Sequence, residues 1–309
     1  MQLFTPSRLA RWLTSGSLAV ALASAPVQAA EMSGDTIRAS ADEVRIAFAA
    51  TDLDGHTIKT LRSSDVAVAD NGLIIRQFRS FRPAMETSLD VVLLLDISGS
   101  VTPQLAAEIA EAKSFLQNSA WQQRDRVSLL AFGGLQTQTL CVRNCREAGA
   151  QEKLNTLRAD GSTPLYDAVV NAARILKQDR DPASRPAIIL FSDGLDTISI
   201  HSAWDALHEA QELQAPIYAL NTRPRKSAPG EGDATLDYLA ANTGGLSFGP
   251  EQNTEKALGL VLDDLRSGYV LTYQLPAQRR RQHSVRLLPT RDPRLQFRSR
   301  RGYDEPSGE

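Results

Sequence analysis

The sequence predicts an α/β fold: a doubly wound, mostly parallel sheet, joined by a small β-sandwich formed by the flanking N- and C-terminal segments. Between about residues 90 and 266, short apolar runs alternate with amphipathic stretches, which is typical of a parallel sheet covered by helices. The first run, Val91 to Leu95, is entirely apolar, as a strand buried on both faces requires. The flanking segments alternate apolar and polar residues, as strands with one solvated face do.

The apolar runs predict the strands of the sheet, and the amphipathic stretches predict the helices that cover it. Buried strands are expected at 90–96, 126–132, 187–192 and 216–221, with a polar edge strand at 135–140. Helices, with apolar residues recurring every three or four positions, are expected at 103–118, 149–158, 165–176, 202–213, 234–242 and 253–266. Thr102-Pro103 and Thr163-Pro164 each fit an N-cap followed by proline at the first helical position.

The flanking segments are predicted to form one β-sandwich. Turn signals at Asp54-Gly55 and Asn71-Gly72 divide the first segment, and the last 40 or so residues have the same strand character. Because neither group of strands can bury a face alone, we expect them to pair, with the α/β part inserted between them. The predicted organisation is a signal peptide at 1–29, an N-terminal β segment at 43–85, an α/β domain at 86–266 and a C-terminal β segment at 267–303.

The N-terminus has the pattern of an export signal. Arg8 and Arg11 precede a moderately apolar stretch that ends near Ala25, and Val27-Gln28-Ala29 is a small-residue cleavage pattern. Serine and glycine interrupt the stretch, which is too short to span a membrane comfortably. We therefore expect an exported protein, periplasmic or secreted, with no transmembrane segment after cleavage.

Cysteine and charge content narrow the class of protein further. Cys141 and Cys145 are the two cysteines, and an oxidising compartment favours a disulfide between them, with two free thiols as the alternative. The formal net charge of −2 gives the chain no strong attraction to nucleic acid. Nine arginines between Arg279 and Arg301 fit either a charged turn with edge-protecting side chains or a contact with an anionic surface.

The first buried strand ends in three oxygen-bearing side chains, Asp96, Ser98 and Ser100, spaced by two. In an open parallel sheet, ligands bind at the carboxyl ends of the strands. A carboxylate with two hydroxyls is a hard-oxygen set that suits Mg²⁺ or Mn²⁺ better than Zn²⁺. The sequence therefore predicts a divalent-metal site at this edge of the sheet.

Two further motifs extend this pattern. Thr163 lies in a loop that runs into a helix, and Asp193 follows another buried strand in Leu-Phe-Ser-Asp-Gly. With the first motif, they resemble the von Willebrand factor type A family, whose metal-ion-dependent adhesion site combines an Asp-x-Ser-x-Ser loop, a threonine and a second aspartate. The resemblance implies that Mg²⁺ or Mn²⁺ is bound by five residues: Asp96, Ser98, Ser100, Thr163 and Asp193.

The resemblance also implies a function. The likeness covers about residues 43–303, and in its flanks the chain resembles a bacterial exported subgroup, through Asp54-Gly55, Asp70-Asn71-Gly72 and the ending Arg300-Arg301-Gly302-Tyr303. In the family, hydroxyl groups contact the ion, which then accepts an acidic oxygen from a protein partner. We therefore expect a non-enzymatic binding or adhesion protein. Three further residues are close enough in sequence to contact the metal ligands and orient them: Ser162, Asp167 and Asp196.

Two alternatives stay open. Asp96 also fits the nucleophile of a haloacid-dehalogenase-like, magnesium-dependent phosphohydrolase, but Ser98 stands where that family needs a second carboxylate. The other alternative is a metal-independent interaction scaffold, in which Ser98 and Ser100 satisfy a turn, Thr163 caps a helix and Asp193 is a turn residue. No nucleophile elbow, phosphate-binding loop or dinucleotide fingerprint is present in the sequence.

Overall fold

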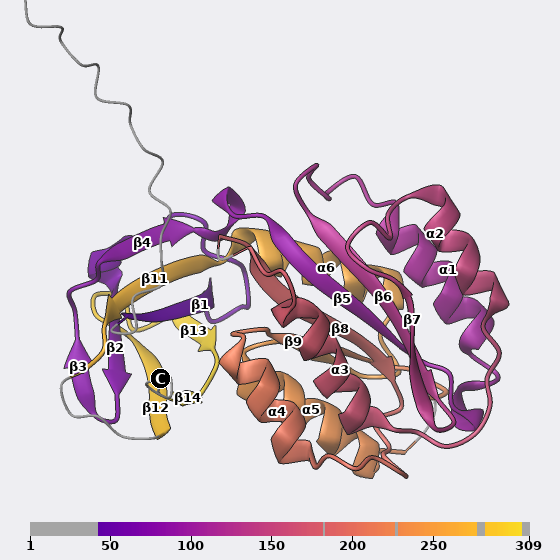
Figure 1. The fold of residues 1–309 in the computed structure, drawn as a ribbon. Helices are drawn as coiled ribbons and strands as arrows, with labels where there is room; N and C mark the ends of the chain where they lie inside the picture. The colour runs from indigo at the N-terminus through magenta and orange to yellow at the C-terminus, as the bar shows by residue number, and fades with distance from the viewer. Residues whose placement is uncertain (1–42, 182, 226–227, 277–281, 305–309) are drawn as a thin grey trace, which may run out of the picture. The chain divides into compact units, whose positions relative to one another are not determined.

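The computed structural model describes residues 43–304 except 182, 226–227 and 277–281. A six-stranded sheet forms the centre of the α/β part (Figure 1). The strand order is β10-β9-β8-β5-β6-β7, and only β7 runs antiparallel to its neighbour. The strands are β5 (Leu89–Asp96), β6 (Arg126–Gly133), β7 (Gln136–Cys141), β8 (Arg185–Ser192), β9 (Ile217–Asn221) and β10 (Ser247–Phe248). The predicted fold class is confirmed.

Helices cover both faces of this sheet. One core contains alternate residues of β5, such as Leu93, together with apolar residues of α1 (Leu105–Leu116) and α6 (Thr254–Ser267). The intervening residues of β5, such as Leu94, belong to a second core with α3 (Leu165–Lys177), α4 (Ala203–Glu212) and α5 (Glu231–Thr243). All eight residues of β5 are buried, which explains why the strand has no polar face.

The flanking segments pair into two antiparallel four-stranded sheets around a common core. One has the order β13-β1-β11-β4 and the other β14-β12-β2-β3, so each combines strands from both ends of the chain. The first sheet contains β1 (Glu43–Thr51), β4 (Ser80–Pro83), β11 (Tyr269–Gln274) and β13 (Gln296–Ser299). The second contains β2 (Val66–Asp70), β3 (Leu73–Ile75), β12 (Gln282–Pro289) and β14 (Gly302–Asp304). This is the predicted sandwich; the exact domain limits stay a prediction.

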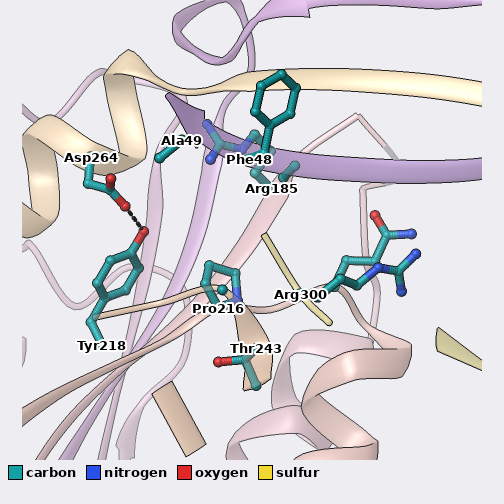
Figure 2. A pocket seen from close by; sticks show the side chains of 11 residues that line it. Phe48, Ala49, Arg185, Pro216, Tyr218, Thr243, Asp264 and Arg300 are labelled. Carbon is teal, nitrogen blue, oxygen red and sulfur yellow. Dashed lines mark hydrogen bonds between the residues drawn. The ribbon is translucent and has the colours of Figure 1, made fainter. Parts of the chain in front are cut away.

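Buried arginines connect the sandwich with the α/β part. Arg300 donates hydrogen bonds to the carbonyl oxygens of Gln211, 3.1 Å away, and Arg45, 3.0 Å away. Figure 2 shows Arg300 at a cavity of about 30 Å³, where the Tyr218 hydroxyl points towards Asp264 and donates a 2.5 Å hydrogen bond to it. Arg298 forms an ion pair with the same carboxylate.

The C-terminal arginines therefore differ in their contacts and exposure. Arg298 and Arg300 bind groups inside the protein, and Arg294 pairs with Asp292 at the surface. Arg286 and Arg301 are exposed. Residues 279–281 and the predicted signal peptide lie outside the described residues.

Several element boundaries differ from the prediction. The segment after Thr102-Pro103 is a turn, and α1 begins only at Leu105. The helix expected at 149–158 is a short α2 (Ala148–Glu152) followed by a 3₁₀ turn (Lys153–Thr156). The sequence analysis missed β10, whose two residues are too few for a periodic pattern.

The predicted disulfide joins Cys141, at the end of β7, to Cys145, with their Cα atoms 5.7 Å apart. Cys145 is completely buried, so the bridge fixes the loop after the edge strand against the sheet. No described helix is long and apolar enough to cross a membrane.

Candidate metal-binding site

Asp96 is the last residue of β5 and is fully buried. One carboxylate oxygen accepts a hydrogen bond from the Ser98 backbone N–H at 2.8 Å, and the other accepts the Ser192 hydroxyl at 2.7 Å. Strand order reverses at β5, because the chain continues to β6 on one side and later returns to β8 on the other. Asp96 therefore lies at the topological switch point, where ligands bind in open α/β sheets.

The two serines follow in a tight turn. Their hydroxyl oxygens are 3.1 Å apart; Ser98 is buried and Ser100 is exposed. The backbone N–H of Gly99 donates to the carbonyl oxygen of Gly161 at 3.0 Å. The serine turn is thereby attached to the loop that carries Thr163.

Thr163 is buried, and backbone contacts fix its loop. Its N–H donates to the Thr197 hydroxyl at 2.8 Å, and its carbonyl oxygen accepts the Thr197 N–H at 2.9 Å. Gly161 has a φ of +76°, and a Cβ there would lie 2.6 Å from the Cα atom of Gly134, so both conformation and space require glycine. The N-cap of α3 is Pro164, with no side-chain cap, so the expectation that Thr163 caps this helix is wrong.

Asp193 follows β8 directly and is buried. One of its carboxylate oxygens accepts the N–H of Leu195 at 3.0 Å. Gly194 has a φ of +80° and packs so tightly that a Cβ would come within 2.1 Å of the Gly232 carbonyl oxygen. The turn that carries Asp193 is therefore rigidly packed against the start of α5.

Asp96 lies in an environment that disfavours its charged form. Burial, with a smaller contribution from the negative charge of Asp193, raises the pKa of Asp96 to about 6, although hydrogen bonds from Ser98 and Ser192 oppose the rise. The ion pairs of the described residues all involve other carboxylates, including Asp90, Asp125 and Asp264. Two buried carboxylates without a basic partner, next to hydroxyl oxygens, suit a hard divalent cation.

The three residues expected to support the proposed ligands contact groups of neighbouring loops. Asp167 accepts the backbone N–H groups of Ile200 and His201, at 3.1 and 2.9 Å, and contacts the His201 ring at 2.6 Å. Asp196 accepts the Ser199 hydroxyl at 2.6 Å. The carbonyl oxygen of Ser162 accepts the N–H of Gly134 at 2.8 Å.

Sequence reasoning missed Ser192 and Thr197, which contact Asp96 and the Thr163 backbone directly. Ser192 immediately precedes Asp193, and this position next to a proposed ligand was the one sequence signal that could have identified it. Thr197 had none, because its contact depends on how two loops pack.

A second group of metal-ligating side chain types lies elsewhere. Asp52, Asp54 and His56 each offer an atom within 4.8 Å of the others in a largely exposed turn after β1. Asp52 already accepts the backbone N–H groups of Asp54 and His56, at 2.9 and 2.8 Å, and contacts the His56 ring at 3.1 Å. These contacts account for the turn without an ion.

Comparisons with known proteins bear on the same region. Residues 91–195 match the family model described as von Willebrand factor type A domain. The chain is 25% identical over 188 residues to the magnesium-chelatase 67 kDa subunit of Chlorobaculum parvum, covering 59% of this chain and 30% of that protein. It is 30% identical over 110 residues to the magnesium-chelatase 60 kDa subunit of Rhodobacter capsulatus, covering 36% of this chain and 20% of that protein. The chain thus spans under a third of the length of these relatives.

Among solved structures, an aerotolerance-related membrane protein from Bacteroides fragilis is similar with a TM-score of 0.47 and 18% identity. That likeness covers 58% of this chain and 98% of the other.

The relatives correct one expectation. The expectation that this protein is not an enzyme is wrong, because several relatives are named as subunits of magnesium chelatase, which is an enzyme. The matched range runs from β5 to the turn after β8 and includes Asp96, Ser98, Ser100, Thr163 and Asp193. Residues 91–195, within the α/β part of this chain, are therefore similar to a von Willebrand factor type A domain.

Proposed function

We propose that this protein captures a protein partner through a divalent cation, Mg²⁺ or Mn²⁺, held by five residues: Asp96, Ser98, Ser100, Thr163 and Asp193. The type A domain supports a metal-dependent binding or interaction role. The observation that carries the proposal is the pair of buried aspartates at the switch point, which have hydroxyl neighbours and no basic partner among the described residues.

The donor set fits the ion. All five side chains offer oxygen, and Mg²⁺ and Mn²⁺ prefer oxygen ligands. Four of the five residues are buried, and Ser100 is exposed, so the ion would be reached from the solvent on the side of Ser100. Bound there, the cation supplies positive charge to an acidic oxygen of the partner.

Exposed apolar side chains near the site support a protein partner rather than a small ion alone. Leu135 is 82% exposed, in the turn whose Gly134 contacts Ser162, and Ile200 is 93% exposed beside Asp167. Large apolar side chains grouped around a polar centre are typical of protein-binding surfaces. The proposed partner therefore presents an acidic residue with apolar neighbours.

Export to an oxidising compartment is also part of the proposal. The disulfide between Cys141 and Cys145 supports it, since such bonds persist in secreted and periplasmic proteins. The N-terminal sequence pattern supports it independently.

The phosphohydrolase alternative is poorly supported. Both carboxylate oxygens of Asp96 accept hydrogen bonds within the protein, and the residue is completely buried, whereas a nucleophile needs an oxygen open to its substrate. The residue two positions later is Ser98, which lacks the acid–base chemistry of a carboxylate.

The magnesium-chelatase likeness suggests a second candidate function. In this alternative the domain is the interaction part of an enzyme assembly and docks onto another subunit by the same metal-dependent contact. Isolation of the protein with its partner, followed by activity measurements on the complex, separates an enzyme assembly from an adhesive one.

The decisive experiment is partner capture with and without chelator. Immobilised wild-type protein should retain a partner in Mg²⁺ and release it in EDTA, whereas Asp96→Ala should retain none. Asp237→Ala, which removes an exposed aspartate of α5, is the matched control and should behave like wild type. Equal retention with and without chelator would reject the metal contact and favour the metal-independent scaffold.

A further inference from the structure

Glu108 is a buried acid with no partner close to the proposed metal site. It lies on α1, one turn after the helix begins, and only 4% of the residue is exposed. Both of its carboxylate oxygens are buried and accept no hydrogen bond from the described residues. Because the lost hydration of a buried polar group without a partner is not compensated, such a residue requires an explanation.

Two further oxygen atoms share this condition. Gln104 precedes Glu108 by one helical turn, so the two side chains lie on the same face of the helix. The side-chain oxygen of Gln104 and the hydroxyl oxygen of Thr222 are also buried without a partner. The Thr222 hydroxyl is near enough to Glu108 to lower the pKa of that acid, but the described residues provide no partner in hydrogen-bonding geometry to these oxygen atoms.

The group lies beside the proposed metal site. The backbone N–H of Thr222 donates to the carbonyl oxygen of Ser192 at 3.1 Å, and the hydroxyl of Ser192 binds Asp96. Burial raises the pKa of Glu108 to about 9, and the charges of Asp96 and Asp193 contribute to this rise. The negative charges of Asp96 and Asp193 are therefore close enough to Glu108 to raise its pKa.

We propose that Glu108 is a sixth residue of the metal site, which accepts hydrogen bonds from water bound to the cation and so sets the affinity for the ion. Water on a divalent cation is a strong hydrogen-bond donor, which is what the oxygen atoms of Glu108, Gln104 and Thr222 lack. Because burial raises the pKa of Glu108 to about 9, the acid is protonated near neutral pH without the ion, and a cation nearby favours its ionised form. This inference rests on the proposed function, because it needs a cation at the five ligands.

Isothermal titration calorimetry with Mg²⁺ and with Mn²⁺ tests the inference. Glu108→Gln keeps the size of the side chain but cannot ionise and replaces one acceptor oxygen with an NH₂ donor. It should weaken cation binding by about 10–100-fold, as changes to residues that contact metal ligands do. Asp237→Asn, at an exposed position of α5, is the matched control and should bind within about twofold of wild type. Equal affinities for wild type and Glu108→Gln would overturn the inference.

Thermal unfolding without metal separates this role from a structural one. Glu108→Gln should unfold at or above the wild-type temperature, since it removes a buried acid with no partner. Thr222→Val is a second test: it removes the hydroxyl at constant volume and should also weaken cation binding. If Glu108→Gln fails to fold, unaltered affinity in Thr222→Val overturns the inference. If wild type itself binds neither cation, the proposed function fails first.

Discussion

The hydroxyl of Ser192 donates a 2.7 Å hydrogen bond to the carboxylate of Asp96, joining the last residues of two neighbouring parallel strands. Both residues are fully buried. The same hydroxyl oxygen accepts the N–H of Gly194 at 3.0 Å, so it links the Asp96 carboxylate to the turn that carries Asp193. Ser192 therefore fixes the distance between the two aspartates of the proposed site.

Replacing Ser192 should affect both stability and metal binding. Ser192→Ala leaves a buried carboxylate oxygen without its donor, so we expect the free energy of unfolding to fall by about 1–3 kcal/mol. Cation affinity should fall by about 10–100-fold, because the orientation of Asp96 is lost. Urea unfolding and calorimetry measure the two effects. A stability loss with unchanged affinity would show that Ser192 does not orient the ligand.

The five proposed ligands were identifiable from the sequence, but the residues that contact them were not. Asp96 was identifiable because a wholly apolar run ends at it, and burial on both faces of a sheet requires such a run. The contact of Ser192 with Asp96 spans 96 residues, and that of Thr197 with Thr163 spans 34. Contacts of this kind depend on strand order and loop packing, which local patterns do not encode.

The local sequence pattern also gave a wrong helix cap where tertiary contacts compete with the cap for the same residues. Thr163-Pro164 has the composition of a capped helix start, yet Pro164 takes the cap position and the Thr163 backbone pairs with Thr197. In this case tertiary contacts override the local preference. The β-sandwich was predictable in outline because half-buried strands need partners, but its strand order required the structure.

A buried polar cluster stabilises the sandwich. Asp70 accepts the hydroxyl groups of Tyr273 at 2.8 Å and Tyr303 at 2.6 Å, and contacts the His283 ring at 2.6 Å. Asp70→Ala removes the common acceptor, so we expect a loss of about 3–5 kcal/mol in the free energy of unfolding. Asp292→Ala, which breaks the exposed pair with Arg294, should change the free energy of unfolding little, because solvent screens that pair. Similar losses in chemical unfolding of the two variants would contradict this assignment.

Acid should release the loop that follows Asp193. Burial alone would raise the pKa of Asp167, but hydrogen bonds from His201 and Ile200 outweigh it and hold the pKa below its usual value. A lowered pKa contributes stability above the unfolded-state value of 3.8, and that stability is lost as the pH falls through the folded-state value. Wild type should therefore exceed Asp167→Asn in unfolding free energy near neutral pH, and the difference should shrink below pH 3.8. A difference that is independent of pH would argue against this role of the Asp167 charge.

The buried arginine at the junction should hold the sandwich and the α/β part in one cooperative unit. Arg300 bonds to carbonyl oxygens of Gln211 and Arg45, and its guanidinium lies 5.0 Å from the centre of the Tyr303 ring. In Arg300→Met these bonds are lost, and we expect calorimetry to resolve two unfolding transitions where wild type shows one. Arg301→Met, at the exposed neighbouring position, is the matched control and should unfold like wild type. A single transition at the wild-type temperature in Arg300→Met would contradict the proposed coupling.

The central claim is that Asp96, Ser98, Ser100, Thr163 and Asp193 form a site for a divalent cation. Titration of the purified protein with Mg²⁺ tests it most directly, with Thr163→Val, which keeps the volume and removes the hydroxyl, measured beside wild type. We predict saturable binding of one ion by wild type and a loss of binding in Thr163→Val, with both proteins equally folded by circular dichroism. Absence of binding by wild type, or equal binding by the two proteins, would contradict the account.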